Sequence, residues 1–215
     1  VKELRIDVGP ERKNRVKAGD WAVFATPFEC DGRVIRAKAL DDRFGVANLI
    51  TLLKNAPDTI DLLAAFTVQE EIGLRGAFAA AFTLQPDIAV AVDCTPAIDQ
   101  PRWDEEENTQ YNTRLGHGPA IYIADRRTIS NPRLVQHFTS VAEAEGIPYQ
   151  YRQPGGGSTD AGAIFHRREG IPVISLSTPG RYLHTPISLA LVEDWRNTYR
   201  LLHAALSKMP AMPGR

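Results

Sequence analysis

The sequence predicts an α/β protein, with a mostly parallel sheet flanked by helices and a short β-rich segment at the N-terminus. Mostly apolar runs at Ile60 to Val68, Asp87 to Asp93 and Pro172 to Ser177 are typical of strands that are covered on both faces. Segments with helical spacing of apolar residues lie between these runs. Such alternation of strands and helices builds parallel sheets.

Composition limits the classes of function that the chain can have. Its 215 residues, 43% hydrophobic and 24% charged, are enough for one main domain with a sizeable core. A formal net charge of -1 argues against nucleic-acid binding, and no apolar run is long enough to cross a bilayer. We therefore expect a cytoplasmic protein that binds a small or peptidic partner and no membrane. Cys30 and Cys94 show no metal-binding spacing, so we interpret both as free thiols.

The first 37 residues have an all-β pattern. Three short segments, Leu4 to Val8, Trp21 to Phe24 and Val34 to Ala37, are separated by turn residues. Three short strands bury little apolar surface alone. This part is therefore expected to pack against another part of the protein or to belong to a larger β domain. The chain starts with Val1 and enters a strand-like run directly, and we interpret it as a fragment or processed product.

A helix is predicted to start at Asp42 and to end before Pro57, because its apolar residues recur at helical spacing. Asp41 and Asp42 lie at its start. Capping of the helix explains one aspartate well and the second less well. A functional role therefore stays open for one of the two.

Three further helices are predicted from the same spacing. One covers Gly73 to Phe82, one starts with Asn131 as its cap and runs to Gly146, and one closes the chain around Leu191 to Leu202. His137 and His203 fall on these helices, where packing or surface roles are expected.

Two stretches are predicted as loops. Residues 96–118 are polar and contain an acidic run, which is typical of a solvated loop. Residues 155–162 are rich in glycine but lack the Lys-Ser/Thr ending of a phosphate-binding loop. These glycines permit close approach of the backbone to a bound group, or they form a plain flexible turn.

Five side chains that can bind a metal ion or transfer a proton lie at the ends of the predicted strands and helices. Loops beyond the carboxyl ends of strands in an open α/β sheet converge on one crevice. Oxygen and imidazole ligands suit zinc, cobalt or manganese, and a carboxylate can bridge two ions. The alternative for the glutamate pair is a strand that simply ends in a polar turn. The five residues are Asp41, Glu70, Glu71, Asp93 and His184.

Six segments resemble, in the same order, the blocks of the TET-type glutamyl or deblocking aminopeptidases, dinuclear metallopeptidases also labelled endoglucanase-M-like. The similarity extends over nearly the whole chain and is highly specific. The segments are Lys38 to Gly45, Val68 to Ala77, Asp93 to Ala97, Gly116 to Ile121, Ser158 to Gly162 and Arg181 to His184.

The resemblance implies a zinc-exopeptidase-like fold and an enzyme that removes N-terminal residues from peptides. Residues 1–37 would be the remnant of an inserted dimerisation domain, and residues 38–215 a catalytic domain without its N-terminal part. Two divalent ions are implied, zinc in the first place and cobalt or manganese as alternatives. Asp41 would bridge them, Glu71 and His184 would hold one, Asp93 the other, and Glu70 would be the general base. A homo-oligomer is expected.

This chain departs from the pattern in one respect. The family has a His-x-Asp block before the β-rich insert, and its His binds the second metal; neither residue of that block occurs here. Two alternatives therefore stand beside the aminopeptidase: an assembly module with one partial metal site, and a related metal-dependent deacylase or carboxypeptidase. A glycosidase would need two carboxylates flanking a sugar, which the Asp and His positions do not favour.

Overall fold

The computed structural model describes residues 6–12, 15–109, 112–153 and 156–210. Its main sheet has four strands in the order β3 (Ala89–Pro96), β6 (Val173–Gly180), β4 (Ala120–Ile121) and β5 (Gln150–Tyr151). The pairs β3–β6 and β4–β5 are parallel, whereas β4 and β6 are antiparallel. The predicted α/β class is confirmed, with a sheet that is mixed and mostly parallel.

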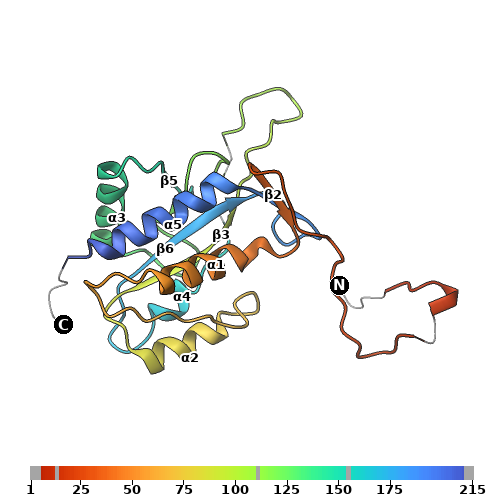
Figure 1. Cartoon of the computed structure of the whole chain (residues 1–215), viewed down its shortest axis with the longest axis horizontal. Helices are drawn as coiled ribbons and strands as arrows, with labels where there is room; N and C mark the ends of the chain where they lie inside the picture. The colour runs from red at the N-terminus through yellow and green to blue at the C-terminus, as the bar shows by residue number, and fades with distance from the viewer. Residues whose placement is uncertain (1–5, 13–14, 110–111, 154–155, 211–215) are drawn as a thin grey trace.

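Helices cover both faces of this sheet (Figure 1). Helices α1 (Leu40–Lys54), α3 (Pro132–Ala144) and α5 (Val192–Ser207) pack on one face. Helices α2 (Arg75–Leu84) and α4 (Ala161–Ile164) pack on the other. The four helices predicted from apolar spacing are therefore present, within a few residues of their expected ends.

The main core lies on the α1, α3 and α5 side. Its largest fully buried side chains include Leu52 from α1, Phe138 from α3 and Leu201 from α5. Ile174 and Leu176 of β6 point into this core, while Val173 points toward α2 and α4. Apolar contacts on both faces explain why the β6 sequence does not alternate.

A small antiparallel sheet joins the N-terminal part of the chain to the last third. It consists of β1 (Glu29–Cys30), β2 (Val34–Ala37) and β7 (Ser188–Leu191), in that order. Asp31 closes the β1–β2 turn, because its Oδ1 accepts hydrogen bonds from the backbone N–H groups of Arg33 and Val34 at 2.9 and 2.7 Å. The predicted strand at Val34 to Ala37 is confirmed, while β1, β4 and β7 were not predicted.

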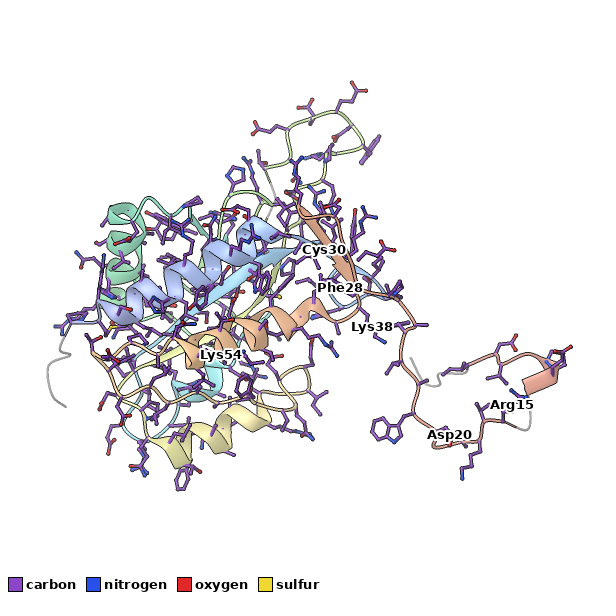
Figure 2. The ribbon with its side chains drawn as sticks, viewed as in Figure 1. Arg15, Asp20, Phe28, Cys30, Lys38 and Lys54 are labelled. Carbon is purple, nitrogen blue, oxygen red and sulfur yellow. The ribbon has the colours of Figure 1, made fainter. Side chains whose placement is uncertain are left out.

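The N-terminal arm, residues 15–28, leads away from the small sheet, and Figure 2 shows Arg15 and Asp20 far from it, whereas Thr26 Oγ1 still donates to Pro186 O at 2.6 Å. It forms no strand, so the prediction for Trp21 to Phe24 is wrong, and Trp21 is fully exposed. Of the strand predicted at Leu4 to Val8, residues 6–8 are not a strand either, and residues 4 and 5 lie outside the described residues. A lone extended segment has no backbone partner and is not a stable strand.

Two further predictions need correction. Asp93 does not end β3, because the strand continues in register beside β6 to Pro96. The run from Ile60 to Val68 is not a strand, since it pairs with no other segment among the described residues. Its apolar pattern is that of a strand, but a strand also needs a backbone neighbour.

Other expectations on local structure hold. The Asn131 side chain accepts hydrogen bonds from the N–H groups of Arg133 and Leu134 and caps α3 as predicted. Both cysteines are free, with Cys30 exposed and Cys94 buried. None of the helices in the described part of the chain is long and apolar enough to cross a membrane.

Asp194 fastens the irregular segment before β4 to helix α5. Its carboxylate is 1% exposed and accepts hydrogen bonds from Gly116 N–H at 2.7 Å and Gly118 N–H at 2.9 Å. We predict that Asp194→Ala lowers the free energy of unfolding by about 2–4 kcal/mol, because two N–H groups, that of buried Gly118 among them, lose a charged acceptor. Urea denaturation measures the effect. Asp58→Ala, which changes an exposed acid, is the matched control and should shift the unfolding free energy by less than about 0.5 kcal/mol.

Candidate metal centre

Three of the five predicted site residues meet beyond the carboxyl end of β6. Nε2 of His184 lies 3.1 Å from Oδ2 of Asp41 and 3.3 Å from Oε1 of Glu71. One ligand atom from each of the three residues lies within 4.8 Å of the others. The three side chains come from the start of α1, from the turn before α2 and from the turn between β6 and β7. The structure thus brings two carboxylates and one imidazole together, while their role as metal ligands stays a prediction.

The two aspartates at the start of α1 have different partners. Oδ1 of Asp42 accepts a hydrogen bond from Gly45 N–H at 2.9 Å, which is the contact of a helix cap three residues ahead. Asp41 instead faces His184. Both residues have non-helical backbone angles, and the peptide bond between them is cis. The cap is therefore Asp42, and Asp41 is the aspartate left for a functional role.

A hydrogen-bonded turn fixes the two glutamates. The carbonyl of Glu70 accepts from Gly73 N–H at 3.0 Å and from Leu74 N–H at 2.9 Å, and Gly76 N–H donates to Val68 O at 2.9 Å. Gly76 packs so closely that a Cβ there would lie 2.5 Å from the backbone nitrogen of Val68. The backbone, rather than the glutamate side chains, thus holds this turn together and leaves the carboxylates free for other contacts.

The turn that carries His184 is held at both ends. Arg181 exchanges two backbone hydrogen bonds with Leu189 of β7, at 2.7 and 3.0 Å. The Arg181 side chain donates from Nε to Oδ1 of Asp99 at 2.7 Å. Because β7 also pairs with β2, the small antiparallel sheet supports the turn that presents the imidazole.

Asp93 lies deeper than the other acids, on β3. Its Oδ1 accepts from Cys94 N–H at 2.7 Å, and burial together with the nearby Asp42 and Asp41 raises the pKa of its carboxyl well above the ordinary value. Asp41 is within hydrogen-bonding reach of Asp93, and this contact partly offsets the rise in the Asp41 pKa caused by burial and by Glu71. Asp93 is therefore joined to the three-residue cluster through Asp41.

Repulsion and burial also act on Glu70 and Asp42. Burial, followed by the charges of Asp160, Glu71 and Asp41, raises the pKa of Glu70 to about 7. Burial raises the pKa of Asp42 to about 8, against the hydrogen bond from Gly45. Carboxyl groups so crowded favour a bound cation or a shared proton.

Asp160 is a member of the site that sequence reasoning on single residues missed. Its Oδ2 accepts a hydrogen bond from the Thr67 hydroxyl at 2.5 Å, and its Oδ1 is buried without a partner among the described residues. The signal was the glycine-rich loop before α4, which was interpreted as a turn or as a site of close backbone approach. Gly155 of that loop lies outside the described residues. Asp160, which follows the glycines, places a carboxylate near Glu70.

The donor set fits one divalent ion well and a second one less completely. Asp41, Glu71 and His184 offer two carboxylates and one imidazole, a set of three protein ligands that suits zinc. On the other side of Asp41 the structure offers Asp93 without a second imidazole. The remaining histidines, all in the described ranges, are engaged or lie elsewhere: His137 contacts Ala205 O at 2.8 Å and His203 contacts Asn55 O at 3.1 Å, as expected for packing residues.

Comparison with known proteins gives one consistent result. The model of the M42 glutamyl aminopeptidases matches residues 1–201. A putative aminopeptidase from Acetivibrio thermocellus is 36% identical over 96% of this chain. Among solved structures, an aminopeptidase from the archaeon Desulfurococcus kamchatkensis superposes on 86% of the chain with 36% identity and a TM-score of 0.78. The Pyrococcus horikoshii TET1 peptidase covers 90% of it, with 34% identity and a TM-score of 0.74.

These relatives are longer than this chain. The matched part is 62% of the Acetivibrio thermocellus protein, 52% of the Desulfurococcus kamchatkensis chain and 56% of the Pyrococcus horikoshii chain. The comparison therefore concerns somewhat more than half of each relative.

A first prediction concerns metal content. We expect the 215-residue chain to hold about one zinc ion tightly, because three protein ligands form a site and Asp93 has no second imidazole beside it. Elemental analysis after gel filtration measures the ratio. His184→Ala should release that ion, whereas His137→Ala, which changes a histidine bonded to a helix carbonyl, should retain it. Two tightly held ions per chain would contradict the prediction.

A second prediction concerns pH. The folded pKa values of Glu70 and Asp42, about 7 and about 8, exceed the ordinary carboxyl values. Between about pH 4.5 and pH 8 the folded protein thus binds more protons than the unfolded chain, so its stability falls as the pH rises. We predict a higher melting temperature at pH 6 than at pH 8 in the presence of a chelator. Asp42→Asn, which keeps an acceptor for the cap, should reduce this difference, and Asp58→Asn should leave it unchanged.

Proposed function

Because this chain belongs to the M42 glutamyl aminopeptidase family, we propose that it carries the catalytic centre of a metal-dependent aminopeptidase. The observation that supports this most is the cluster of Asp41, Glu71 and His184 directly beside a further carboxylate, Glu70. Peptides with a free N-terminal amine are the proposed substrates. The reaction is hydrolysis of their first peptide bond.

We assign the metal ligands as follows. Asp41, Glu71 and His184 would hold one divalent ion, and Asp93, which lies next to Asp41, would hold the other together with it. Zinc is the first choice, with cobalt or manganese as alternatives, because the ligands are oxygen and imidazole without thiolate. Bound divalent ions supply a water of lowered pKa and polarise the substrate carbonyl.

Glu70 is the proposed general base. It is adjacent to Glu71 in a tight turn, so one glutamate binds metal while its neighbour remains free to accept a proton. In the metal-free chain, burial and the charges of Asp160, Glu71 and Asp41 raise the pKa of Glu70 to about 7, and a positioned carboxyl group can accept a proton and later donate it. Glu70 takes the proton of the attacking water and returns it to the amine that leaves.

Self-assembly is the proposed quaternary state. The Pyrococcus horikoshii TET1 peptidase is described as forming a tetrahedron or a large octahedral shell. In this chain, residues 1–37 would belong to a dimerisation domain and residues 38–215 to the catalytic domain. The exposed arm agrees with that division, since Trp21 is fully exposed and Phe28 is 68% exposed. Apolar side chains this exposed are typical of a surface that contacts another chain.

A second candidate is an assembly module with one metal, and a specific observation favours it. Asp93 is the only assigned ligand of the second ion besides the shared Asp41, and no histidine of the described chain lies next to it. In this reading the 215 residues bind one ion tightly and hydrolyse peptides only when another polypeptide completes the site.

We predict that Glu70→Gln retains bound metal and loses at least about 100-fold in turnover, because the amide cannot accept the proton. Hydrolysis of a peptide with a free amine, and of its N-acetylated counterpart, measures activity and separates an aminopeptidase from a deacylase or carboxypeptidase. Glu106→Gln, in an exposed loop, is the matched control. Peptide hydrolysis by Glu70→Gln at the parental rate would refute the role. A chain that holds one ion and hydrolyses neither peptide would favour the second candidate.

A further inference from the structure

Arg152 is a buried cation without an acidic partner. It is 5% exposed, and its Nε and Nη1 atoms have no hydrogen-bond partner among the described residues. Nη2 donates to the carbonyl of Gly156 at 2.5 Å, and the guanidinium lies 4.7 Å from the centre of the Tyr122 ring. No carboxylate in the described part of the chain forms an ion pair with it.

The charge of this guanidinium calls for a partner. Arginine is not deprotonated in proteins, so Arg152 stays charged although it is buried. A buried charge that is left unpaired lowers the stability of the fold. Water can satisfy the N–H groups of Nε and Nη1 but does not neutralise the charge, whereas a bound anion does both.

Arg152 lies on the same face of the main sheet as Asp93. Tyr122, on which its guanidinium stacks, directly follows β4 and donates its N–H to Ser175 O of β6 at 3.1 Å. Residues opposite each other in neighbouring strands point to the same face, and so do alternate residues of one strand. Tyr122, Ser175 and Ser177 therefore share a face. Ser177 is opposite Asp93 in the register of β6 and β3, so the face continues to the proposed metal ligand.

The side chains on this face between β3 and β5 are polar. The hydroxyls of Thr95 and Ser177 are buried and have no hydrogen-bond partner of normal geometry among the described residues. Burial raises the pKa of Tyr122 to about 12, against these two nearby hydroxyls and the charge of Arg152, and the charge of Asp93 adds to the rise. The Tyr122 hydroxyl is thus close to the guanidinium and to the metal centre. Unpaired polar groups therefore lead from one to the other.

Residues 156–160 connect Arg152 to the proposed general base. Gly156, whose carbonyl accepts from Arg152, is exposed, and a Cβ built on it would meet nothing within 4 Å. Four residues later comes Asp160, whose charge raises the pKa of Glu70. A peptide held beside Glu70 would thus lie against the same short segment that contacts the guanidinium.

We propose that Arg152 binds a carboxylate of the peptide substrate. Guanidinium groups pair with carboxylates through short, charge-assisted hydrogen bonds, and the N–H groups on Nε and Nη1 are left for such an acceptor. The carboxylate belongs to the side chain of the first residue of the substrate or to the C-terminus of a short peptide. The inference rests on the proposed function, because it names a group on the substrate of that site.

An NMR titration of the zinc-loaded chain tests the proposal with three peptides whose first bond is reduced to CH2–NH, so that none is hydrolysed. Glu-Ala-Ala amide carries a side-chain carboxylate, Gln-Ala-Ala with a free C-terminus carries a terminal one, and Gln-Ala-Ala amide carries neither. The Nε–H signal of Arg152, identified by its absence in Arg152→Lys, reports the contact. We expect one of the two acidic peptides to shift that signal and to bind at least about tenfold more tightly than the neutral peptide.

Variants of Arg152 separate carboxylate binding from a structural role. Arg152→Gln removes the charge, and Arg152→Met, which fills the space with an unbranched apolar chain, serves where the amide prevents folding. Either should lower the affinity for the acidic peptide to that of the neutral peptide, whose own affinity stays unchanged. A merely structural role would weaken binding of all three peptides alike. Arg33→Gln, at an exposed arginine in the β1–β2 turn, is the matched control and should keep the preference.

Equal affinity of the parent chain for all three peptides, or no binding of any, would overturn the proposal, and buried water would then be the partner of Arg152. A carboxylate preference that persists in the folded Arg152 variants would overturn it as well. Hydrolysis of the unmodified peptides is assayed separately. A chain that prefers a carboxylate through Arg152 but hydrolyses no peptide supports this inference and counts against the peptidase, and hydrolysis without the preference does the reverse.

Discussion

The parallel pairing of β3 with β6 is the interaction on which the site depends. The two strands run in register from Ala89 opposite Val173 to Pro96 opposite Gly180. Because they are parallel, their carboxyl ends lie at the same end of the sheet. Asp93, near the carboxyl end of β3, and the turn that carries His184, which follows β6, therefore lie at that end. The small sheet then fixes the turn, because β7 pairs with β2 directly after it.

Crowding of negative charge is the consequence of this convergence. Burial raises the pKa values of Asp41, Asp42, Glu70, Asp93 and Asp160, and neighbouring carboxylates add to the rise at all of them except Asp160. A fold that gathers so many acids at the end of a buried strand loses stability when all of them are charged. Cations offset that loss, and the imidazole of His184 beside two of the carboxylates gives them a place to bind. A cation bound at the proposed site would thus stabilise the fold as well as supply chemistry.

Local rules predicted the helices and much of the site. Asn131 and Pro132 mark the start of α3 by capping and by the restricted backbone of proline, and both effects act within a few residues. Asp41 and Asp42 could be separated only in the structure, because the sequence cannot show which one accepts the hydrogen bond from Gly45. Strands of two residues, such as β4, are too short to show an alternating apolar pattern. The position of Asp160 depends on its contact with Thr67, which is 93 positions away in the sequence. Long-range pairing, rather than local preference, decided these cases.

The segment from Ile60 to Val68 is the opposite case, because local preference predicted a strand there that does not form. Its composition is that of a buried strand, and it leads directly into Glu70 and Glu71. Yet it joins neither sheet in the described part of the chain, and Val68 O instead accepts a hydrogen bond from Gly76 N–H at 2.9 Å in the turn before α2. The apolar pattern therefore predicted a strand, but a strand also depends on a backbone partner that the pattern of one segment does not show.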